Sequence, residues 1–499
     1  MAQFVKLDPS VLKELRKVDE CLVSYNVEMT EVTGGTFWKA YTDAQVDGTE
    51  PFGAILDWSD MGNLQQWYDP IDTKNPRLIK LAKDLGPAWI RVSGTWANKT
   101  YYDFDGRCNG QVPAGFQNLL TKDQWLSLLD FVKAVGGKLL VSIANCPGIH
   151  DAGDPIPFEQ ADLLFRTSKE YGVPIAAAEF PNEPNLMAMS GLPQGYTPAD
   201  HARDHDRFGA WLRENYPECL FVGPCTVGDI AMFDIGNDGA GGGMAAGMEI
   251  VTTDALLGDY KVPMDVFSYH YYNGVSERGA AMGGHWPYEA VLTENYLGVA
   301  AKCASQYVAR RDKYVPGGQM WVTESGDAGC GGNTWASTYA DVPRTLNELG
   351  QFCTITDGVI FHNTLASSDY GFLKHGTFEP RPNYFAVLLW NRLMGQTVYA
   401  TGEEIREGAH VYCHSRKDGQ AGYAYLVINT SEDVTTVELP KDATVYALTG
   451  NGKLRSRTML LGGKELVLGE NDALPRLCGE AVCAGKLEVA PGGCTFIVL

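Results

Sequence analysis

The stretch KDQWLSLLDFVKAVGGKLLVSIA, residues 122–144, contains the unit that decides the fold. Residues 122–135 place apolar side chains at helical spacing, and after two glycines the run 138–144 is almost entirely apolar. A short apolar run predicts a buried strand, and an amphipathic segment beside it predicts a helix that covers the sheet. The unit therefore predicts a parallel sheet with crossover helices.

The same alternation continues on both sides of this stretch. We expect further helices at 76–85, 198–215, 288–313, 335–351 and 381–394. The strand-forming runs are 22–29, 88–93, 138–144, 174–179, 219–223, 264–270, 319–324 and 357–362. Eight strand-and-helix units predict an α/β fold of the (β/α)8, or TIM, barrel type.

From residue 397 the pattern changes to short alternating runs, such as HVYCHSR and TVYALTG, separated by Gly, Asp and Asn. This pattern predicts an antiparallel β-sandwich. We therefore expect a barrel over 22–396, a β-sandwich over 397–499, and an N-terminal segment over 1–21 that packs on the β module. An insertion over 33–53 and a Gly-rich active-site loop over 236–247 are expected to depart from the regular barrel.

The charge of the chain excludes several classes of partner. In 499 residues, 40 Lys and Arg stand against 61 Asp and Glu, so the formal net charge is 40 − 61 = −21. Nucleic acids and anionic membranes are bound first through neutralised phosphates, and such a chain is repelled by both. We expect no nucleic-acid or membrane partner.

The sequence also carries expectations about compartment. No apolar stretch reaches the ~18 residues of a membrane helix, and the start of the chain lacks the basic-then-apolar layout of a signal peptide. The 12 cysteines include no C-x-x-C pair, which favours reduced thiols. These features together predict a cytoplasmic protein.

Two of the predicted strands lead to glutamates at the end of the barrel where catalytic groups gather. Run 174–179 continues into Asn182-Glu183, and run 319–324 ends in Glu324. Two carboxyl groups that face each other across a barrel mouth suit glycosidic-bond cleavage, because one protonates the leaving oxygen while the other attacks the anomeric carbon. This pair predicts a retaining glycosidase that needs no cofactor.

The chain resembles the heparanase and β-glucuronidase family, glycoside hydrolase family 79. The matching segments are LGPAWIRVSGTWAN (85–98), PNEPN (181–185), FSYHYYNG (267–274), WVTESGDAGCGG (321–332), SSDYGFL (367–373) and FEPRPNYF (378–385). The resemblance spans nearly the whole chain and implies a β-glucuronidase with a C-terminal β-sandwich. It implies a small glucuronide or oligosaccharide as the substrate.

By this resemblance Glu183 is the general acid/base, Glu324 is the nucleophile, and Asn182 holds the 2-hydroxyl of the sugar. Arg91 is placed to pair with Glu324 and keep it ionised, while Glu183 needs a raised pKa to stay protonated until it acts. Two residues of the sixth run complete the expected site: Tyr272 as a hydrogen-bond donor to the nucleophile, and His270 on the same wall.

For the carboxylate of the uronic acid, the resemblance implies Gly331, Gly332 and Tyr370. Consecutive backbone amides can bind an anion without a formal positive charge. By this resemblance Cys330 stands where members of the family often carry tyrosine, and the loop before it is one residue longer, so the register at this loop is open by one position.

Several alternatives stay open on sequence grounds. His201 and His205, at i and i+4, have the spacing of zinc ligands on a helix face, although a packed histidine pair is the simpler interpretation. Cys330 with His270 would suit a thiol hydrolase, and a non-catalytic carbohydrate-binding barrel is a third class. Trp58, Trp67, Trp96 and Trp286 lie in loop segments and could stack on a sugar.

The choice between terminal and internal cleavage depends on charge at the barrel mouth. Sulfated chains require clustered bases along the cleft. The expected mouth loops offer only Lys99, Arg278, Lys374 and His375. We therefore favour hydrolysis of terminal glucuronides, with an endo-β-glucuronidase of the heparanase or hyaluronidase type as the alternative.

Overall fold

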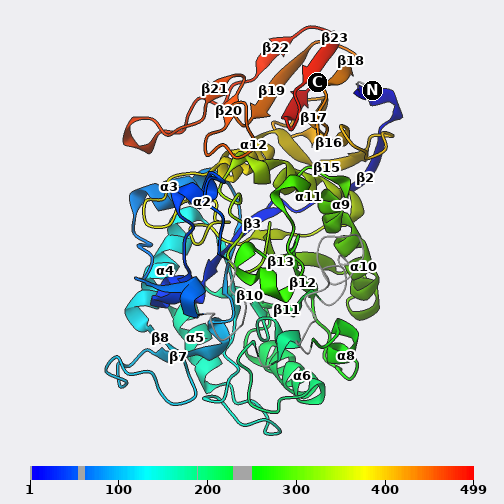
Figure 1. Ribbon diagram of the computed structural model, residues 1–499. Coiled ribbons are helices and arrows are strands. Elements are labelled where there is room, and N and C mark those ends of the chain that lie inside the picture. Colours follow the sequence, from blue (N-terminus) through cyan, green and yellow to red (C-terminus); the bar gives the residue numbers. More distant parts are fainter. Residues whose placement is uncertain (1–2, 54–61, 188, 229–249) are drawn as a thin grey trace.

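A computed structural model describes residues 3–53, 62–187, 189–228 and 250–499 (Figure 1). Its centre is a closed barrel of eight parallel strands, in which each strand pairs with the next along the chain and β14 closes on β3. The strands are β3 (Val23–Glu28), β6 (Trp89–Ser93), β9 (Lys138–Ser142), β10 (Ile175–Glu179), β11 (Leu220–Val227), β12 (Val266–Tyr272), β13 (Gln319–Gly326) and β14 (Ile360–His362). Each predicted run overlaps one of them, although β11, β12 and β13 continue two to four residues beyond the predicted ends, so the predicted barrel is confirmed. The Gly-rich loop expected at 236–247 lies outside the described residues.

Helices surround the barrel. They are α1 (Met29–Thr33), α3 (Pro76–Asp84), α4 (Lys122–Val135), α5 (Glu159–Glu170), α6 (Pro198–Asn215), α8 (Thr253–Leu257), α9 (Glu294–Leu297), α10 (Val299–Tyr314), α11 (Val342–Ile355) and α12 (Pro382–Leu393). The segment expected as one helix over 288–313 is divided into α9 and α10, which are separated at Gly298. The helix expected from 335 starts only at Val342, with Pro343 in its first turn, where a missing N–H costs nothing.

The stretch quoted first shows why these elements form. The hydroxyl of Thr121 accepts from the backbone of Gln124 in a capping box, which fixes the start of α4. Gly136 ends the helix with φ +70°, a conformation that glycine adopts without a steric penalty. A Cβ atom on Gly137 would lie 2.6 Å from Cδ1 of Ile90, so the second glycine lets β9 pack against its neighbour β6.

Two further sheets form a β module at one end of the barrel (Figure 1). Its strands from the C-terminal part are β15 (Met394–Ala400), β16 (His410–Arg416), β17 (Tyr423–Ile428), β18 (Thr435–Leu439), β19 (Ala443–Thr449), β20 (Leu460–Leu461), β21 (Lys464–Glu465), β22 (Glu480–Val482), β23 (Gly485–Val489) and β24 (Cys494–Val498). Two strands come from the N-terminal segment. β1 (Gln3–Lys6) runs parallel to β18, and β2 (Lys13–Lys17) runs antiparallel to β15.

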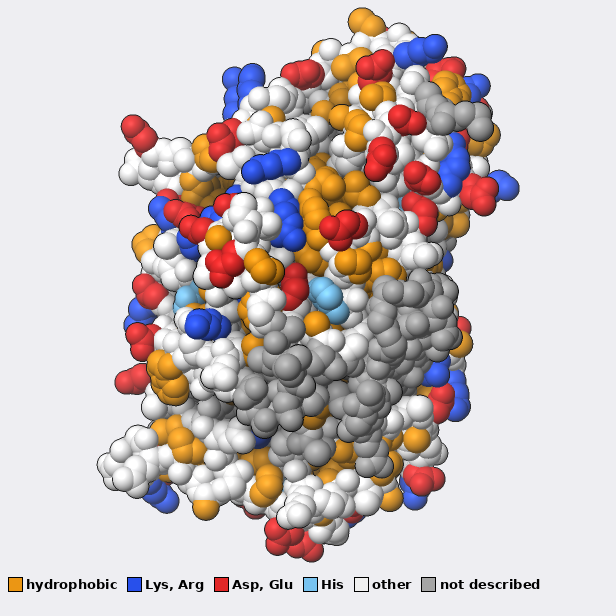
Figure 2. All heavy atoms as spheres, viewed as in Figure 1, with side chains coloured by type: hydrophobic (Ala, Val, Ile, Leu, Met, Phe, Trp, Pro, Cys, Tyr) orange, Lys and Arg blue, Asp and Glu red, His pale blue; other side chains and the backbone are white. Residues whose placement is uncertain are grey.

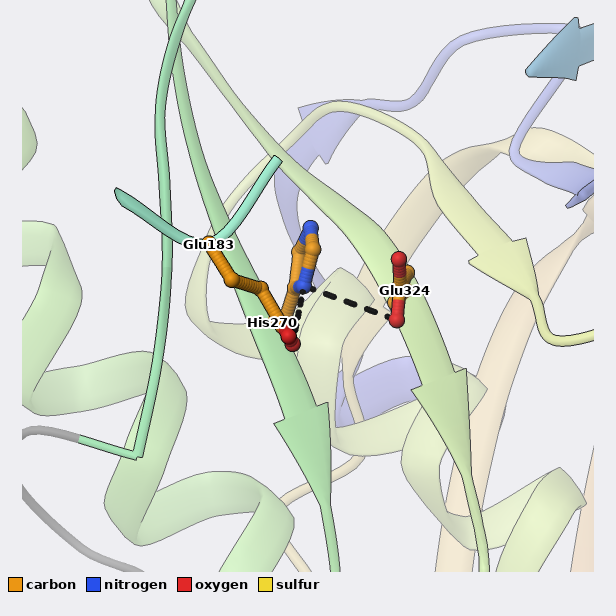
Figure 3. A group of neighbouring side chains, drawn as sticks. All are labelled: Glu183, His270 and Glu324. Atoms are coloured by element: carbon orange, nitrogen blue, oxygen red, sulfur yellow. Dashed lines mark hydrogen bonds and ion pairs between the residues drawn. The ribbon is translucent and has the colours of Figure 1, made fainter. Parts of the chain in front are cut away.

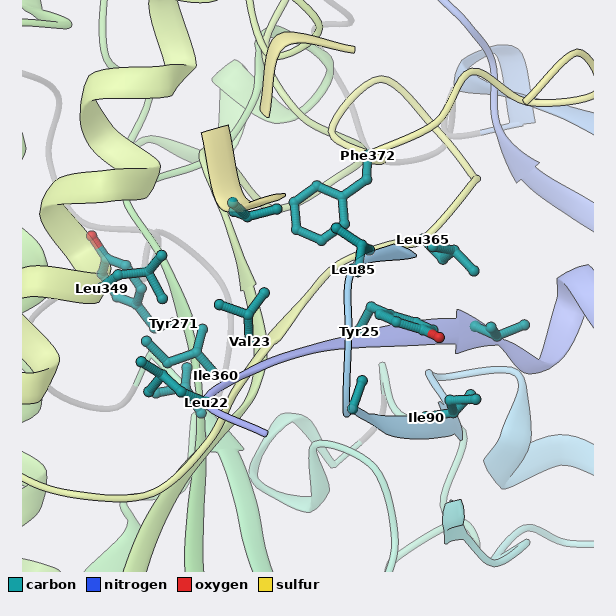
Figure 4. Close-up of a cluster of buried hydrophobic side chains, with 14 of the residues drawn as sticks. Leu22, Val23, Tyr25, Leu85, Ile90, Tyr271, Leu349, Ile360, Leu365 and Phe372 are labelled. Carbon is teal, nitrogen blue, oxygen red and sulfur yellow. The ribbon is translucent and has the colours of Figure 1, made fainter. Parts of the chain in front are cut away.

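The apolar core explains how the parts hold together. One large cluster joins barrel strands to the surrounding helices, as Leu22, Tyr25, Ile90, Leu349 and Phe372 show in Figure 4. A separate cluster fills the β module, with side chains from both of its sheets. Among the described helices, none combines the length and the apolar character that crossing a membrane requires. On the face in Figure 2, acidic side chains are spread over barrel and module and interspersed with basic ones.

Short elements between barrel strands and helices form the walls above the barrel. The hairpin of β4 (Gly35–Trp38) and β5 (Gln65–Tyr68) follows the first strand. The parallel pair β7 (Thr100–Asp103) and β8 (Asn118–Thr121) follows the second. The expected insertion over 33–53 thus contains β4 and the short helix α2 (Asp43–Val46).

Candidate active site

A pocket of about 330 Å³ opens at the carboxyl ends of the barrel strands. Seven of the eight strands supply a lining residue at their carboxyl end or within four residues of it. These residues are Glu28, Gly94, Glu183, Val227, Tyr272, Glu324 and Asn363. Because the ends of parallel strands meet at one face of a barrel, side chains far apart in the sequence converge here.

The two predicted glutamates face each other across this pocket (Figure 3). One carboxylate oxygen of Glu183, one of Glu324 and a ring nitrogen of His270 all lie within 4.8 Å of one another. Glu324 lies on β13, whereas Glu183 lies in the loop after β10 with φ +47°, which is uncommon for a residue other than glycine. The Glu183 side chain is 13% exposed and that of Glu324 only 6%.

Arg91, in the middle of β6, connects the residues of the site. Its Nε donates to Glu179 at 2.8 Å and its Nη1 donates to Glu324 at 2.9 Å. Its Nη2 donates to Oδ1 of Asn182 at 2.7 Å and lies 3.2 Å from Nε2 of His270. The expected pairing of Arg91 with Glu324 is therefore present, and the guanidinium is fully buried with two carboxylates as partners.

The surroundings of Glu324 favour its ionised form. Burial alone would raise the pKa of this carboxyl, but the neighbouring His270 and the charge of Arg91, with the hydrogen bonds from Arg91 and Tyr272, bring the pKa below its ordinary value. The Tyr272 hydroxyl donates to Oε2 of Glu324 at 2.8 Å, as the sequence predicted. Burial and the nearby Glu324 raise the pKa of Tyr272, so its hydroxyl stays a donor.

The surroundings of Glu183 favour its protonated form. Burial raises the pKa of this carboxyl, and the negative charge of Glu324 adds to the rise, against the hydrogen bond from His270. Nδ1 of His270 lies 2.9 Å from Oε1 of Glu183. Because a guanidinium can only donate, Nε2 of His270 accepts from Arg91 and its Nδ1–H donates to Glu183. The two carboxyl groups thus have pKa values displaced in opposite directions.

Asn182 is held firmly before Glu183. Its backbone N–H donates to Asn98 at 2.9 Å, and its carbonyl accepts from the Asn98 amide at 2.8 Å. Its own Oδ1 accepts from Arg91, and the residue lines the pocket. The two short segments that carry Asn98 and Asn182 are therefore locked together beside the acid/base candidate.

The loop after β13 differs in detail from the expectation. Gly329 and Cys330 line the pocket, whereas Gly331 and Gly332 are buried and do not. The N–H of Gly332 donates to the carbonyl of Ala328 at 3.2 Å, so this amide is already engaged. The N–H groups of Cys330 and Gly331 make no hydrogen bond to a described residue. The available amides are therefore one position earlier than the predicted pair.

Tyr370 lines the pocket as predicted, and its hydroxyl accepts from Asn363 at 3.1 Å. Arg278 is buried beside the loop after β13, a position that the sequence did not indicate. Arg278, expected at the mouth, is instead 1% exposed and paired with Asp369, with its guanidinium 3.7 Å from the ring centre of Tyr41. It donates to the carbonyl of Gly332 at 2.9 Å and so shapes the loop rather than the entrance.

Two carboxyl groups near the site were missed by sequence reasoning. Glu28, at the end of β3, lines the pocket, and its Oε2 is buried without a partner among the described residues. Burial and the neighbouring Glu324 and Glu31 raise the pKa of Glu28, so we expect this carboxyl to be neutral. Burial also raises the pKa of Glu31 to about 8. The available signal was the run 22–29 itself, an apolar strand that ends in an unexplained acid.

The histidine pair with the spacing of zinc ligands is a packing contact, which was the simpler interpretation of the sequence. His201 and His205 are fully buried on α6, between the rings of Phe180 and Phe221 at centroid distances of 5.9 and 4.5 Å. Burial lowers the pKa of both rings, to about 3 for His205, so they are neutral. Within the described part of the chain, the side chains close enough to share a metal are instead Glu183, His270 and Glu324.

The remaining candidates from the sequence are the Cys330 thiol and the loop tryptophans. Burial raises the pKa of the Cys330 thiol to about 12, and the bonded partners of His270 are Arg91 and Glu183, which disfavours a thiol nucleophile. Trp96 lines the pocket, Trp286 is buried, and Trp67 is 68% exposed. Trp58 lies outside the described residues.

Two curated relatives match most of the chain. No family model matches the chain. It is 27% identical to heparanase-like protein 1 of Arabidopsis thaliana, over 89% of both chains. It is 26% identical to baicalin-β-D-glucuronidase of Scutellaria baicalensis, over 86% of this chain and 84% of that one.

Solved structures give the same fold. The structure of a 4-O-α-L-rhamnosyl-β-D-glucuronidase from Fusarium oxysporum superposes over 100% of both chains with a TM-score of 0.62, at 11% identity. That likeness concerns the fold alone, whereas the sequence relatives carry the family resemblance. The resemblance to glycoside hydrolase family 79 is thus confirmed, and this chain is a glycoside hydrolase.

Proposed function

We propose that the protein is a retaining β-D-glucuronidase that removes terminal β-glucuronides. The observation that carries the mechanism is the spacing of carboxylate oxygens of Glu183 and Glu324, within 4.8 Å. Retaining glycosidases keep their two carboxyl groups ~5–5.5 Å apart, whereas inverting enzymes need ~6.5–9.5 Å to admit a water molecule. The spacing supports direct attack by one carboxylate.

In the first step Glu324 attacks the anomeric carbon and forms a glycosyl ester. The bond from that carbon to the leaving oxygen breaks, and the proton of Glu183 moves to the leaving oxygen. The depressed pKa of Glu324 supplies the anion, and the raised pKa of Glu183 supplies the proton. His270 donates a hydrogen bond to Glu183 and stabilises the carboxylate that remains after proton transfer.

In the second step Glu183, now ionised, takes a proton from a water molecule, and the water oxygen attacks the anomeric carbon. The ester bond to Glu324 breaks, and its carboxylate is released with Arg91 and Tyr272 as hydrogen-bond donors. The same donors that keep the nucleophile ionised therefore favour its departure. Both carboxyl groups return to their starting protonation states.

Recognition of a uronic acid rests on the loop after β13. We propose that the N–H of Cys330, which lines the pocket and makes no hydrogen bond to a described residue, binds the sugar carboxylate, with Tyr370 from the facing loop. Backbone amides can bind an anion without a formal positive charge. In a pocket that holds three glutamates this is an advantage, because a cationic side chain in their place would pair with one of those carboxylates. The names of the Arabidopsis and Scutellaria relatives support this sugar class.

The pocket favours a compact substrate. Its volume of about 330 Å³ lies at the small end of the range of ~300–1,000 Å³ for ligand sites. A cleft for a sulfated polysaccharide would require several bases, and the described wall holds Lys99 alone. Endo-cleavage of a glycosaminoglycan stays the second candidate because one relative is a heparanase-like protein.

A substrate panel tests the proposal. We expect hydrolysis of aryl β-glucuronides, at least about 100-fold slower hydrolysis of the matching β-glucosides, and no shortening of hyaluronan or heparan sulfate. Glu324→Gln should lose activity by several orders of magnitude with its melting temperature preserved. Hydrolysis of β-glucosides but not of glucuronides would contradict the sugar assignment, and unchanged activity in Glu324→Gln would contradict the mechanism.

A further inference from the structure

Lys99 is the one Lys or Arg among the residues described as lining the pocket. Three carboxyl groups line the same pocket, Glu28, Glu183 and Glu324. Yet Lys99 forms no ion pair with a described residue, and its ammonium donates to none of them. A partly buried cation without an anionic partner at a substrate pocket is an unsatisfied group that a ligand can satisfy.

The surroundings of Lys99 place it on the side of the acid/base. The segment Ala97–Lys99 is tied to the Glu183 loop, because the Asn98 amide donates to the carbonyls of Asn182 at 2.8 Å and Ser190 at 3.0 Å. The Ser190 hydroxyl in turn donates to the carbonyl of Glu183. The residue that protonates the leaving oxygen must lie beside the leaving group. Lys99 therefore lies beside the leaving group as well.

The packing of Lys99 keeps it close to that loop. A Cβ atom on Gly191, which has φ +74°, would lie 2.5 Å from Cδ of Lys99, so the lysine stem crosses directly over this glycine. Burial lowers the pKa of Lys99, as expected for a cation that lacks a counter-charge. Three apolar side chains of the same pocket provide a surface for a flat group: Trp96, Leu186 and Met189.

We infer that Lys99 binds an anionic group carried by the leaving group, so that this enzyme prefers glucuronides whose aglycone has an acidic substituent and an apolar face. This inference rests on the proposed function and extends it to the other half of the substrate. A carboxylate or sulfate would pair with the ammonium, while the ring that bears it would contact Trp96, Leu186 and Met189. The Lys99 ammonium would also offset the negative charge that this anion adds to a pocket lined by three glutamates.

The test uses two fluorogenic substrates, 3-carboxyumbelliferyl and 4-methylumbelliferyl β-D-glucuronide, which share the coumarin ring; the first carries a 3-carboxylate and the second a 4-methyl group. The wild type should show the higher kcat/KM on the carboxylated substrate. Lys99→Met should reduce this preference about tenfold, which corresponds to ~1.4 kcal/mol, mainly through KM. Lys99→Arg should retain it. Lys122→Met, which removes an exposed lysine outside the pocket, is the matched control and should leave the preference unchanged.

A second pair of substrates identifies the source of the anion: glucuronyl-glucosamine disaccharides with and without a sulfate. A preference lost in Lys99→Met for this pair as well would extend the site to acidic sugars, while an effect on the coumarin pair alone would restrict it to acidic aromatic groups. Either result supports the inference.

Three outcomes separate the inference from the proposed function. Failure of the wild type to hydrolyse any glucuronide would remove the proposed function, and the inference with it. Hydrolysis by the wild type without any preference would overturn the inference alone, whatever the folding of the variants. An equal loss on both coumarin substrates in Lys99→Met would show that the lysine acts on the sugar carboxylate, which also overturns it.

Discussion

Replacement of Tyr272 by phenylalanine removes one oxygen atom from the centre of the site. The Tyr272 hydroxyl donates to Glu324 at 2.8 Å and accepts from Asn363 at 2.9 Å. A hydrogen bond to a charged group contributes ~1.5–3 kcal/mol, and each 1.36 kcal/mol corresponds to a factor of ten. Because the lost bond stabilises the carboxylate, the pKa of Glu324 must rise. We expect the acidic limb of the kcat/KM profile to move to higher pH, with activity below that limb reduced about 10- to 150-fold.

The assay is the pH dependence of kcat/KM on an aryl β-glucuronide, measured with a melting curve at each pH. Tyr271→Phe is the matched control, because its buried hydroxyl donates to Asn273 and makes no contact with Glu324. That variant should lose stability but keep the acidic limb in place. An unmoved limb in Tyr272→Phe, or an equal movement in Tyr271→Phe, would refute the role assigned to the Tyr272 hydroxyl.

Three further predictions follow from the same geometry. Glu183→Gln should slow the hydrolysis of glucuronides with poor leaving groups by about 10²–10⁴-fold, and the hydrolysis of glucuronides with activated leaving groups far less. Steady-state kinetics over a series of aglycones measures this difference. An equal loss on all members of the series would argue against proton donation by Glu183. Between pH values of about 4.5 and 8, Glu31 is protonated in the folded protein, where its pKa is about 8, but ionised in the unfolded chain. The free energy of unfolding should therefore fall by up to ~1.4 kcal/mol per pH unit across this range. Thermal unfolding of Glu31→Gln should show less of this decline, and the same pH dependence of stability in the variant and the wild type would contradict the prediction. Exhaustive dialysis against EDTA should leave aryl-glucuronidase activity unchanged, and a loss restored by added metal would instead favour an ion held by Glu183, His270 and Glu324.

The barrel was predictable because its signals are local and repeated. Each strand is a short apolar run, and the polar residue that ends it faces the mouth whatever the details of the loops. This is why Glu324, Arg91 and Tyr272 could be assigned, with their mutual contacts, from the predicted strands together with the family resemblance. Eight apolar strand runs, each followed by a helical segment, are compatible with few folds other than the (β/α)8 barrel.

The parts that were not predictable depend on contacts distant in sequence. Arg278 looks like a mouth residue in the sequence, and only the arrival of Asp369 and Tyr41 from two other loops buries it. The register of the loop after β13 depends on the bond from Gly332 to Ala328, which no local pattern specifies. Glu28 was read as part of a strand because an apolar run gives no sign that its last carboxyl will enter a pocket.

The pairing of β1 with β18 and of β2 with β15 has a consequence for biosynthesis. A chain made from its N-terminus exposes both strands while the ribosome adds more than 370 residues, the separation of Thr397 from its partner Lys17. During that time the barrel can form, but each early strand lacks its partner. The sequence of β2, KELRK, carries four charged side chains in five residues, and charged strands resist association with other chains. Its composition therefore suits a segment that must wait, unpaired and in solvent, for the last part of the chain.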